Sequence, residues 1–469
     1  QSLAAYEASG CYSGLRRALT TLSPDQVIDT VQTAGLRGRG GAGFPTARKW
    51  RLARQAEEQQ RFVICNADEG DPGAFMDRNL VEGDPFAVLE GLCIAGYAIG
   101  AQRGFVYVRQ EYPLAVARLT AAVEQARAGG WLGADVVGSG WAFDVEIRRG
   151  AGAFVCGEET ALIASLEGRR GIPRRRPPYP VASGYQDKPT SINNVETCAA
   201  VAWILANGPE GFASHGVGTS RGTKIFSLAG DIRRGGMVEV PMGITIGEIV
   251  NEIGGGSPRG KAIKAVQIGG PSGGCLPAAL FDTPIDYESL RDTGAIMGSG
   301  SLIAMDESCC MVDVARYFLA FTQDESCGRC TFCRVGTRRM LDILDRLCAG
   351  KGKRGDLDAL QTLGEHVLAA SLCGLGGSAP NPVLTTLRYF RDEYEAHLQG
   401  RCPAAKCREL ITFRIDPSLC DGCTLCMDQC TMQAIAPTTA AIALNIDAEM
   451  CTRCSGCLQV CRFDAVSVG

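Results

Sequence analysis

Eight cysteines near the C-terminus constrain this chain more than any other feature, because they form the same spacing twice. The pattern CxxCxxCxxxC begins at Cys420 and again at Cys451. Each run supplies four thiolates, which is the number that one cubane [4Fe-4S] cluster requires. The first run is Cys420, Cys423, Cys426 and Cys430, and the second is Cys451, Cys454, Cys457 and Cys461. We therefore predict a small domain over residues 413–469 that is built around two such clusters.

The repeat has the spacing of bacterial two-cluster ferredoxins, in which the fourth cysteine of each run binds the other cluster. One cluster would then take Cys420, Cys423, Cys426 and Cys461, and the other would take Cys451, Cys454, Cys457 and Cys430. The proline that usually follows the fourth cysteine is absent, and Thr431 and Arg462 stand in its place. Because the eight spacings match, we expect a bacterial-ferredoxin-like domain here.

A further cysteine group lies in the sequence ESCGRCTFC at residues 325–333. Cys327, Cys330 and Cys333 follow one another at two-residue spacing, and Cys373 comes after a helical-looking run. Structural zinc sites usually take two separated Cys/His pairs, and a disulfide would use only two of these thiols. We therefore favour a third [4Fe-4S] cluster, at the head of a helical bundle over residues 305–400.

Cys402 and Cys407 lie in a linker over residues 401–412, and with His397 just before it they offer three soft ligands for zinc. The sequence does not show a fourth ligand, and two free thiols are the alternative interpretation. The remaining cysteines are interpreted as small buried apolar residues: Cys11, Cys65, Cys93, Cys156, Cys198, Cys275, Cys309, Cys310 and Cys348.

The overall composition limits the class of protein. A chain of 469 residues should form three or four domains, and its net charge of −4 argues against nucleic-acid binding. No apolar run approaches the ~20 residues of a membrane span, and no secretory signal pattern is visible. Clustered cysteines in so large a chain indicate metal sites assembled in a reducing, cytoplasmic compartment. The chain does not begin with Met, so we expect the native protein to start before Gln1.

Residues 1–222 alternate between strands and helices, which predicts an α/β layer domain. Asn66, Asp68, Glu69 and Asp71 follow a predicted strand, at the edge where α/β folds bind ligands. Gly157 permits a turn, and Glu158 and Glu159 open a helix, where the helix dipole favours acidic residues. Asn193 and Asn194 precede a helix and could cap it or bind a ligand. A loop at residues 35–46 contains Gly38, Arg39, Gly40 and Gly41 and precedes Lys49, which suits a phosphate or dinucleotide. A flexible surface loop, an acidic turn and a helix cap are the alternatives for these three features.

Residues 223–304 contain short strands and one predicted helix over residues 245–253, and they indicate a β-grasp-like module without a catalytic constellation. The whole chain is thus expected to be multidomain α/β + α.

Taken together and in this order, the glycine loop, NADE, GEET, INNVET and ESCGRCTFC closely resemble the NADH- and FMN-binding subunit of respiratory complex I, from about Ser13 to Tyr394. The C-terminal double-cluster domain is not part of that subunit. It resembles the corresponding flavoprotein (beta, or HydB-type) subunit of NAD(P)-linked, often electron-bifurcating, multimeric hydrogenases. The resemblance implies a Rossmann-like FMN domain.

The resemblance also implies roles for individual residues. Those matching FMN-binding or pocket-shaping positions are Gly38, Arg39, Gly40, Gly41, Lys49, Asn66, Asp68, Glu69, Gly157, Glu158, Glu159, Asn193 and Asn194. Phe44 matches the aromatic residue that stacks on the NADH adenine, and Glu159 and Arg176 match positions near the nicotinamide nucleotide. Asp71 and Leu52 stand where complex I has Glu and a second aromatic residue, which leaves NADH affinity and the choice between NAD(H) and NADP(H) open. Phe154 stands where complex I has Tyr, and so lacks a hydroxyl that could hydrogen-bond near the flavin.

The implied activity is reversible hydride transfer between NAD(P)H and FMN, followed by single-electron transfer through three [4Fe-4S] clusters. Expected partners are a thioredoxin-like [2Fe-2S] subunit, which this chain does not contain as a domain, and a hydrogenase or formate dehydrogenase catalytic subunit. Electron bifurcation with ferredoxin is a further expectation. The alternatives are an NADH-oxidising module that does not bifurcate and a non-catalytic iron–sulfur scaffold.

Overall fold

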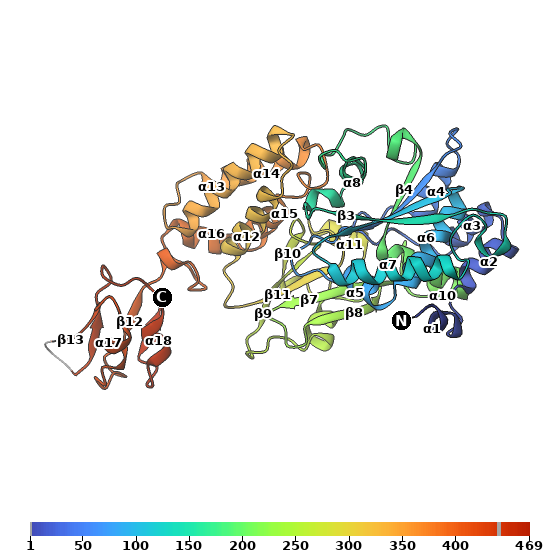
Figure 1. Ribbon diagram of the computed structural model, residues 1–469. Helices are drawn as coiled ribbons and strands as arrows, with labels where there is room; N and C mark the ends of the chain where they lie inside the picture. Colours follow the sequence, from blue (N-terminus) through green and yellow to red (C-terminus); the bar gives the residue numbers. More distant parts are fainter. Residues whose placement is uncertain (1, 439–441) are drawn as a thin grey trace.

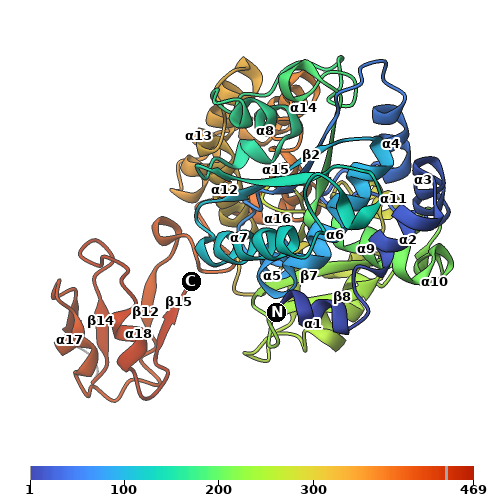
Figure 2. The ribbon, with the colours of Figure 1, turned by 45° about the vertical axis from the view of Figure 1, so that its right-hand side comes forward.

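The computed structural model describes residues 2–438 and 442–469, so Gln1 and residues 439–441 lie outside the described part. Figure 1 shows three regions: a large α/β region with a second sheet beneath it, a helical bundle, and a small C-terminal domain. The small domain stands apart from the rest in Figure 2 as well, and the chain reaches it through the end of the bundle.

The α/β domain contains a parallel four-stranded sheet in the order β3-β2-β1-β4. Its strands are β1 (Phe62–Ala67), β2 (Arg103–Arg109), β3 (Asp144–Gly150) and β4 (Thr190–Asn194). Its helices are α1 (Leu3–Ala8), α2 (Ser13–Thr21), α3 (Pro24–Thr33), α4 (Thr46–Arg54), α5 (Met76–Gly83), α6 (Pro85–Ile99), α7 (Pro113–Ala128), α8 (Glu159–Leu166), α9 (Val195–Asn207) and α10 (Pro209–Ala213). Short 3₁₀ turns lie at η1 (Val136–Gly138), η2 (Phe154–Gly157) and η3 (Tyr185–Asp187), and a hairpin β5 (Gly216–Val217)–β6 (Ser220–Arg221) follows.

Alternation along the strands divides the α/β core into two layers. Val63 and Cys65 of β1 enter the core formed with α2, α3, α4, α6 and α9, whereas Phe62 and Ile64 enter the core formed with α8. This is the period of two that a strand buried on both faces requires. Helices α6 and α9 approach closely at Gly91, where an added Cβ would lie 1.8 Å from the Cys198 carbonyl oxygen. The domain therefore has the predicted α/β layers, with helices on both faces of its sheet.

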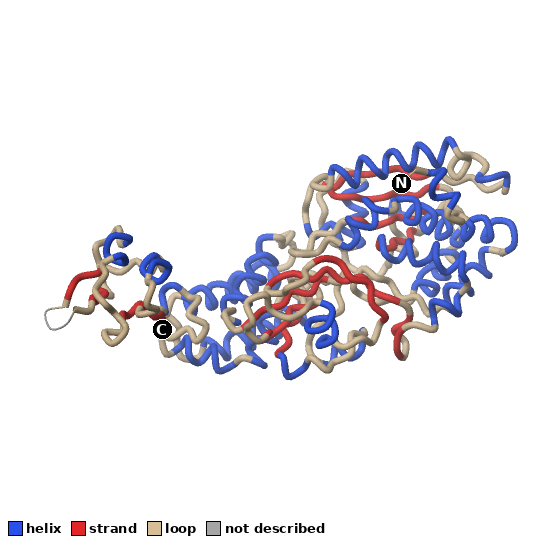
Figure 3. Tube along the Cα trace, turned by 90° about the horizontal axis from the view of Figure 1, so that it is seen from below, coloured by secondary structure: helices blue, strands red, loops and turns tan. Residues whose placement is uncertain are grey.

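A second, mixed sheet has the order β10-β9-β11-β7-β8. Its strands are β7 (Thr223–Gly230), β8 (Gly236–Pro241), β9 (Ile263–Ile268), β10 (Gly274–Pro277) and β11 (Ser301–Asp306), with η5 (Ala278–Leu280) and α11 (Tyr287–Asp292) between strands. The first and last strands are parallel neighbours at its centre, as the β-grasp expectation requires. Figure 3 shows this second set of strands beside the first sheet.

The helix expected over residues 245–253 is a π-helix, η4, at Glu248–Ile253. Thr245 stands before it and accepts a hydrogen bond from the Glu248 N–H, while the Glu248 carboxylate accepts from Thr245 in return. This reciprocal capping sets the start of the helical turn.

The bundle consists of α12 (Met311–Asp324), the π-helical turn η6 (Phe332–Gly336), α13 (Thr337–Cys348), α14 (Asp356–Ala370), α15 (Asn381–Tyr389) and α16 (Arg391–Leu398). Leu319, Leu344, Leu360 and Tyr394 are fully buried in its core. Among the described residues, no helix has the length and apolar character that a membrane crossing needs.

After η7 (Arg408–Leu410), the C-terminal domain pairs β12 (Phe413–Ile415) with β15 (Val466–Val468) and β13 (Ile435–Pro437) with β14 (Leu444–Ile446). Helices α17 (Leu425–Gln429) and α18 (Gly456–Val460) pack against each other. Six of the eight cysteines of the repeat are among the residues of its core or pack against that core. The domain is the ferredoxin-like unit that the cysteine repeat predicts.

Candidate functional site

The ends of two neighbouring strands bring the polar residues of the α/β domain together. Strands β1 and β4 are parallel, and Asn66 lies opposite Asn194 in the register. The Asn66 side chain donates to the Gly157 carbonyl at 2.9 Å and accepts from the Asp68 N–H at 3.0 Å. The NADE and GEET segments therefore meet at the carboxyl edge of the sheet, which is where α/β folds bind ligands.

Asp68 and Asn193 at this edge hold buried polar atoms that make no hydrogen bond within the part of the chain that the structure describes. Both carboxylate oxygens of Asp68 are buried without a hydrogen bond, and so is Nδ2 of Asn193. The other amide atom of Asn193, Oδ1, accepts from the Trp50 indole at 3.0 Å, which fixes the amide with its N–H₂ group free. A buried polar group normally has a partner, so these atoms fit a ligand with both donor and acceptor groups.

Burial also sets the charge of Asp68. Desolvation is the largest effect and raises the pKa of this carboxyl from 3.8 to about 7, although the nearby Arg109 cation lowers it in part. One guanidinium nitrogen of Arg109 is likewise buried without a partner. An N–H or O–H donor from a ligand would stabilise the Asp68 carboxylate at this position.

Other residues of the predicted site use their side chains to build the pocket wall. The Arg39 guanidinium is buried and donates to the carbonyls of Arg37 and Arg221. The Glu69 carboxylate accepts the N–H groups of Asp77 and Arg78 at the start of α5. The side chains of Arg39 and Glu69 therefore hold the backbone around the site in place.

Two helices begin at the edge of the sheet, with acceptors as their caps. Glu158 accepts the N–H groups of Thr160 and Ala161 at the start of α8, and Asn194 accepts that of Glu196 at the start of α9. The cap interpretation of the two consecutive Asn residues is confirmed for Asn194. Asn194 also donates to the Asp77 carboxylate at 2.6 Å.

The glycine-rich loop packs closely against its surroundings and leads into α4. Gly41 and Gly43 have φ values of +119° and +61°, and a Cβ on Gly43 would lie 2.5 Å from the Tyr287 ring. Beyond the loop, Lys49 forms an ion pair with Glu159 and donates to the Ile192 carbonyl at 2.7 Å. The glycine-rich loop, which includes Gly38 and Gly40, therefore leads to Lys49, and Lys49 contacts both α8 and β4.

Asp71 joins the α/β domain to the second sheet. It hydrogen-bonds the Ser299 hydroxyl, its carboxylate lies against Gly270, and burial raises its pKa to about 6. Gly298 in turn packs on Gly41 of the glycine loop. The module of residues 223–304, in which the sequence showed no chemistry, thus contributes one wall beside the site.

Two of the residues expected to contact NAD(P)H, Phe44 and Arg176, lie at the surface. Phe44 is 43% exposed, and the Arg48 guanidinium carbon lies 5.7 Å from its ring centroid. Arg176 is exposed in the loop before β4 and lies over the Tyr179 ring at 5.9 Å.

The loop with Cys327, Cys330 and Cys333 is held against η2, the turn that leads into the GEET segment. Glu325, just after α12, accepts the Phe154 N–H at 3.0 Å, and the Phe154 and Phe321 rings meet edge to face at 5.4 Å. Cys327 packs against the core under α8. Cys333 and Cys373 approach as well, because an added Cβ on Gly376, three residues after Cys373, would lie 3.0 Å from the Cys333 Cβ. The polar edge and the cysteine loop are thus adjacent.

In the C-terminal domain, one small cavity of about 20 Å³ is lined by Cys420, Cys423, Cys426 and Cys461. Cys461 belongs to the second run, so the fold brings together the crossed set that the sequence suggested. Cys430, Cys451 and Cys457 pack against the same core, and Cys454 is exposed.

A fourth candidate ligand joins the three residues around the linker. The ligand atoms of Cys310, His397, Cys402 and Cys407 all lie within 4.8 Å of one another, and all four residues are buried. The sequence interpretation of Cys310 as a small apolar residue missed this, because Cys310 precedes α12, far from the linker in sequence. The same interpretation also failed for burial at Cys11, Cys309 and Cys348, which are only half-buried.

The distances in this group match tetrahedral zinc. The sulfurs of Cys407 and Cys310 are 3.8 Å apart, and His397 Nε2 lies 3.3 Å and 3.4 Å from them. Zn–S bonds of about 2.3 Å in a tetrahedron place two sulfurs about 3.8 Å apart. His397 Nδ1 lies 2.7 Å from the Glu393 carbonyl, the usual way in which a metal-binding imidazole is oriented.

Comparison with known families divides the chain in the same way. Residues 31–203 match the Nuo51 FMN-binding domain, residues 313–397 the NADH-ubiquinone oxidoreductase-F iron–sulfur binding region, and residues 412–462 a 4Fe-4S dicluster domain. The FMN-binding family agrees with the unpartnered Asp68 and Asn193 atoms at the sheet edge.

Individual relatives agree with these matches. The NADP-reducing hydrogenase subunit HndC of Solidesulfovibrio fructosivorans is 54% identical over 93% of this chain and 89% of its own length. An NADH-quinone oxidoreductase subunit of Rhizobium meliloti is 43% identical over 86% of this chain and 96% of its own.

Among solved structures, the NAD⁺-reducing [NiFe]-hydrogenase in the H₂-reduced state superposes with a TM-score of 0.74 at 42% identity. The match covers 80% of this chain and 63% of the hydrogenase chain, so this protein spans less than two thirds of that neighbour. The relatives are oxidoreductase subunits of larger complexes. The chain belongs to the family of FMN-binding, iron–sulfur subunits of NADH-quinone oxidoreductase and their hydrogenase counterparts.

Proposed function

We propose that this chain catalyses reversible hydride transfer between NAD(P)H and FMN and passes the electrons one at a time through [4Fe-4S] clusters to a partner subunit. The observation that carries the proposal is the direct link from Glu325 to the Phe154 N–H, which holds the cysteine loop against the polar edge of the sheet. Because the two are adjacent, a flavin bound at that edge would lie beside the first cluster.

Bound FMN would supply the step between a two-electron hydride donor and one-electron carriers. This chain's residues would bind and orient it. Asp68 and Asn193 offer a free acceptor and a free donor, and the backbone of the glycine loop offers N–H groups for a phosphate, with the Lys49–Glu159 ion pair beside the loop. Hydride transfer requires no side-chain acid or base, so the protein's part is positioning and exclusion of water.

The twelve cysteines in three groups support three [4Fe-4S] clusters. The first would use Cys327, Cys330, Cys333 and Cys373, and the crossed pairing would supply the other two in the C-terminal domain. Since that domain stands apart from the sheet, it offers a second outlet for electrons. We propose a hydrogenase or formate dehydrogenase catalytic subunit and a thioredoxin-like [2Fe-2S] subunit as partners.

A second candidate function, electron bifurcation with ferredoxin, is favoured by the two additional clusters of the C-terminal domain. Whole-complex assays would test it: NAD⁺ reduction that proceeds equally well without ferredoxin would reject bifurcation. A non-catalytic scaffold, the remaining alternative, would yield purified protein with about twelve irons and without flavin.

We also propose a structural zinc at Cys310, His397, Cys402 and Cys407. The site ties the start of α12 to the end of α16 and to the linker, which is where the C-terminal domain joins the bundle. Its closed set of four ligands leaves no open position, as is usual for a structural zinc ion rather than a catalytic one.

The direct test of the proposed function is anaerobic titration of the reconstituted full chain with NADH or NADPH. Loss of the visible flavin absorbance is expected with at least one of them. A protein that binds FMN yet keeps this absorbance with both would reject the proposal.

A further inference from the structure

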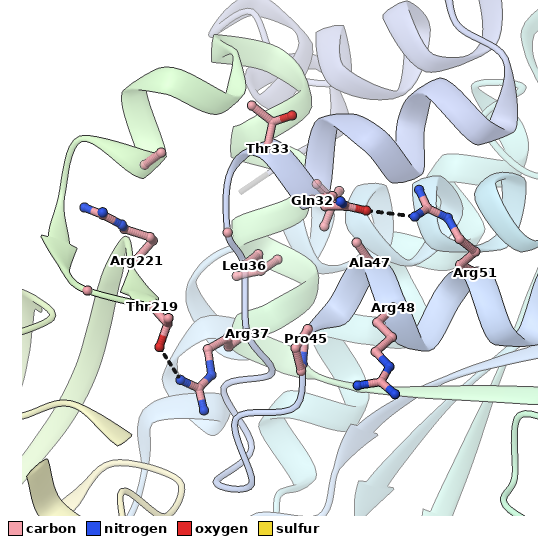
Figure 4. A pocket seen from close by; sticks show the side chains of 14 residues that line it. Gln32, Thr33, Leu36, Arg37, Pro45, Ala47, Arg48, Arg51, Thr219 and Arg221 are labelled. Carbon is pink, nitrogen blue, oxygen red and sulfur yellow. Dashed lines mark hydrogen bonds between the residues drawn. The ribbon is translucent and has the colours of Figure 1, made fainter. Parts of the chain in front are cut away.

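A pocket of about 950 Å³ opens beside the glycine-rich loop. All the charged side chains that line it are positive. Its walls are the end of α3, residues 35–37 of the loop, the start of α4 and the β5–β6 hairpin (Figure 4). Four arginines line it, namely Arg37, Arg48, Arg51 and Arg221, and none of its fourteen lining residues is acidic.

Two of these arginines are neutralised and two are not. Arg37 pairs with Glu288 at 2.8 Å, and Arg51 pairs with Asp29 at 2.5 Å. Within residues 2–438 and 442–469, neither Arg48 nor Arg221 forms an ion pair. The pocket therefore carries excess positive charge, which suits an anionic group.

Arg48 connects this pocket to the exposed face of α4. Phe44, Arg48 and Leu52 recur at four-residue spacing, so they lie along one face of the helix and the turn before it. Phe44 and Leu52 are 43% and 45% exposed, and the Arg48 guanidinium lies over the Phe44 ring. Figure 4 shows the side chains of Arg37 and Arg48 extending on the two sides of Pro45. An aromatic ring of a ligand that stacked on Phe44 would therefore lie beside the Arg48 guanidinium.

We propose that Arg48 binds the 2′-phosphate of NADP(H), beside an adenine that rests on Phe44, and that Arg221 adds to the attraction. The inference rests on the proposed function, in which a nicotinamide dinucleotide is the hydride donor. Dinucleotide sites that select NAD(H) usually present a carboxylate to the ribose hydroxyl, whereas a nearby arginine accommodates a 2′-phosphate. A guanidinium fork also matches the geometry of a phosphate group.

Calorimetry with the full, FMN-loaded chain tests the subsite without turnover. The probes are adenosine 2′,5′-bisphosphate and 5′-AMP, which differ only in the 2′-phosphate. We expect the wild type to bind the bisphosphate more tightly, and Arg48→Ala to weaken that binding about tenfold while leaving 5′-AMP nearly unchanged. Arg54→Ala is the matched control, because Arg54 lies on the same helix, pairs with Asp25 and does not line the pocket.

Rates of anaerobic flavin reduction by NADPH and NADH give a second readout. Arg48→Ala should slow reduction by NADPH much more than reduction by NADH. The proposal is overturned if Arg48→Ala affects both probes equally or neither, or if Arg54→Ala has the same effect. Failure of both nucleotides to reduce bound FMN would reject the proposed function, while the calorimetric comparison would still decide whether Arg48 recognises the 2′-phosphate.

Discussion

At the scale of single residues, the side chains around the polar edge fall into two groups. The side chains of Arg39, Glu69 and Asn194 form hydrogen bonds with other residues of the protein. Asp68 and Asn193 instead keep buried polar atoms that have no hydrogen-bond partner among the described residues. The second group costs free energy in the flavin-free protein, because buried polar atoms without partners lose their hydration. A ligand that pairs with them recovers that cost, so the site is prepared for binding at the expense of stability.

Asp68→Asn tests this trade-off. The pKa of Asp68 is raised to about 7 in the folded protein, so wild-type stability is lost as the pH rises from about 4 through 7. Each pKa unit corresponds to about 1.4 kcal/mol, so charging Asp68 costs up to about 4 kcal/mol above pH 7. We expect the flavin-free variant to have the higher Tm at pH 8, no advantage at pH 4, and about tenfold weaker FMN affinity. Thermal unfolding across this pH range and a fluorescence titration with FMN are the measurements.

A Tm difference that does not vary with pH would show that Asp68 does not titrate as described. Glu57→Gln provides a control, because it neutralises an exposed carboxylate that is not among the charges that shift the pKa of Asp68.

At the scale of elements, the crossed pairing of cysteines links α17 and α18 through their clusters. Cys423→Ala and Cys461→Ala should each remove one cluster, or about four irons. If both cysteines hold the same cluster, as the cavity they line indicates, the double variant also loses only about four irons. Cys423→Ala combined with Cys457→Ala should lose about eight. Iron analysis of these four variants decides this, and a loss of eight irons in the first double variant would refute the crossed pairing.

The start of α12 offers a second test at this scale. Cys310→Ser should release about one zinc per chain and lower the Tm by several degrees, because losing a buried metal ligand costs roughly 3 kcal/mol. Cys309→Ser is the neighbouring control, since Cys309 is half-buried and bonds Asp231 instead. Metal analysis that finds equal zinc in both variants and in the wild type would remove Cys310 from the site.

At the scale of the whole molecule, the sequence predicted more of the fold than of the contacts between its parts. Local spacing was enough for the ferredoxin-like repeat, because ligands of one domain lie close together in sequence. The continuous burial of β1 and β2 was likewise visible as short apolar runs. These features depend on nearest neighbours along the chain, which is what sequence patterns record.

Contacts between distant segments were not visible in the same way. Cys310 completes the zinc-binding group from a position before α12, and Asp71 is held by Ser299 of another module. The excess charge at Arg48 depends on which carboxylates pair with its neighbours, and that is decided only by the folded chain. Such features require the tertiary structure, because no periodicity marks them.

The proposed direction of electron flow through the molecule is tested most directly by anaerobic NAD(P)H titration of wild type and Cys330→Ser, followed by visible absorbance and by electron paramagnetic resonance at low temperature. We predict flavin bleaching in both proteins. Only the wild type should then develop the signal of a reduced [4Fe-4S] cluster next to the flavin, and only it should deliver electrons to an added acceptor complex at the full rate. Equal cluster reduction and equal electron delivery in the variant would contradict this electron route, because the loop at Cys327–Cys333 would then not be the way out of the flavin site.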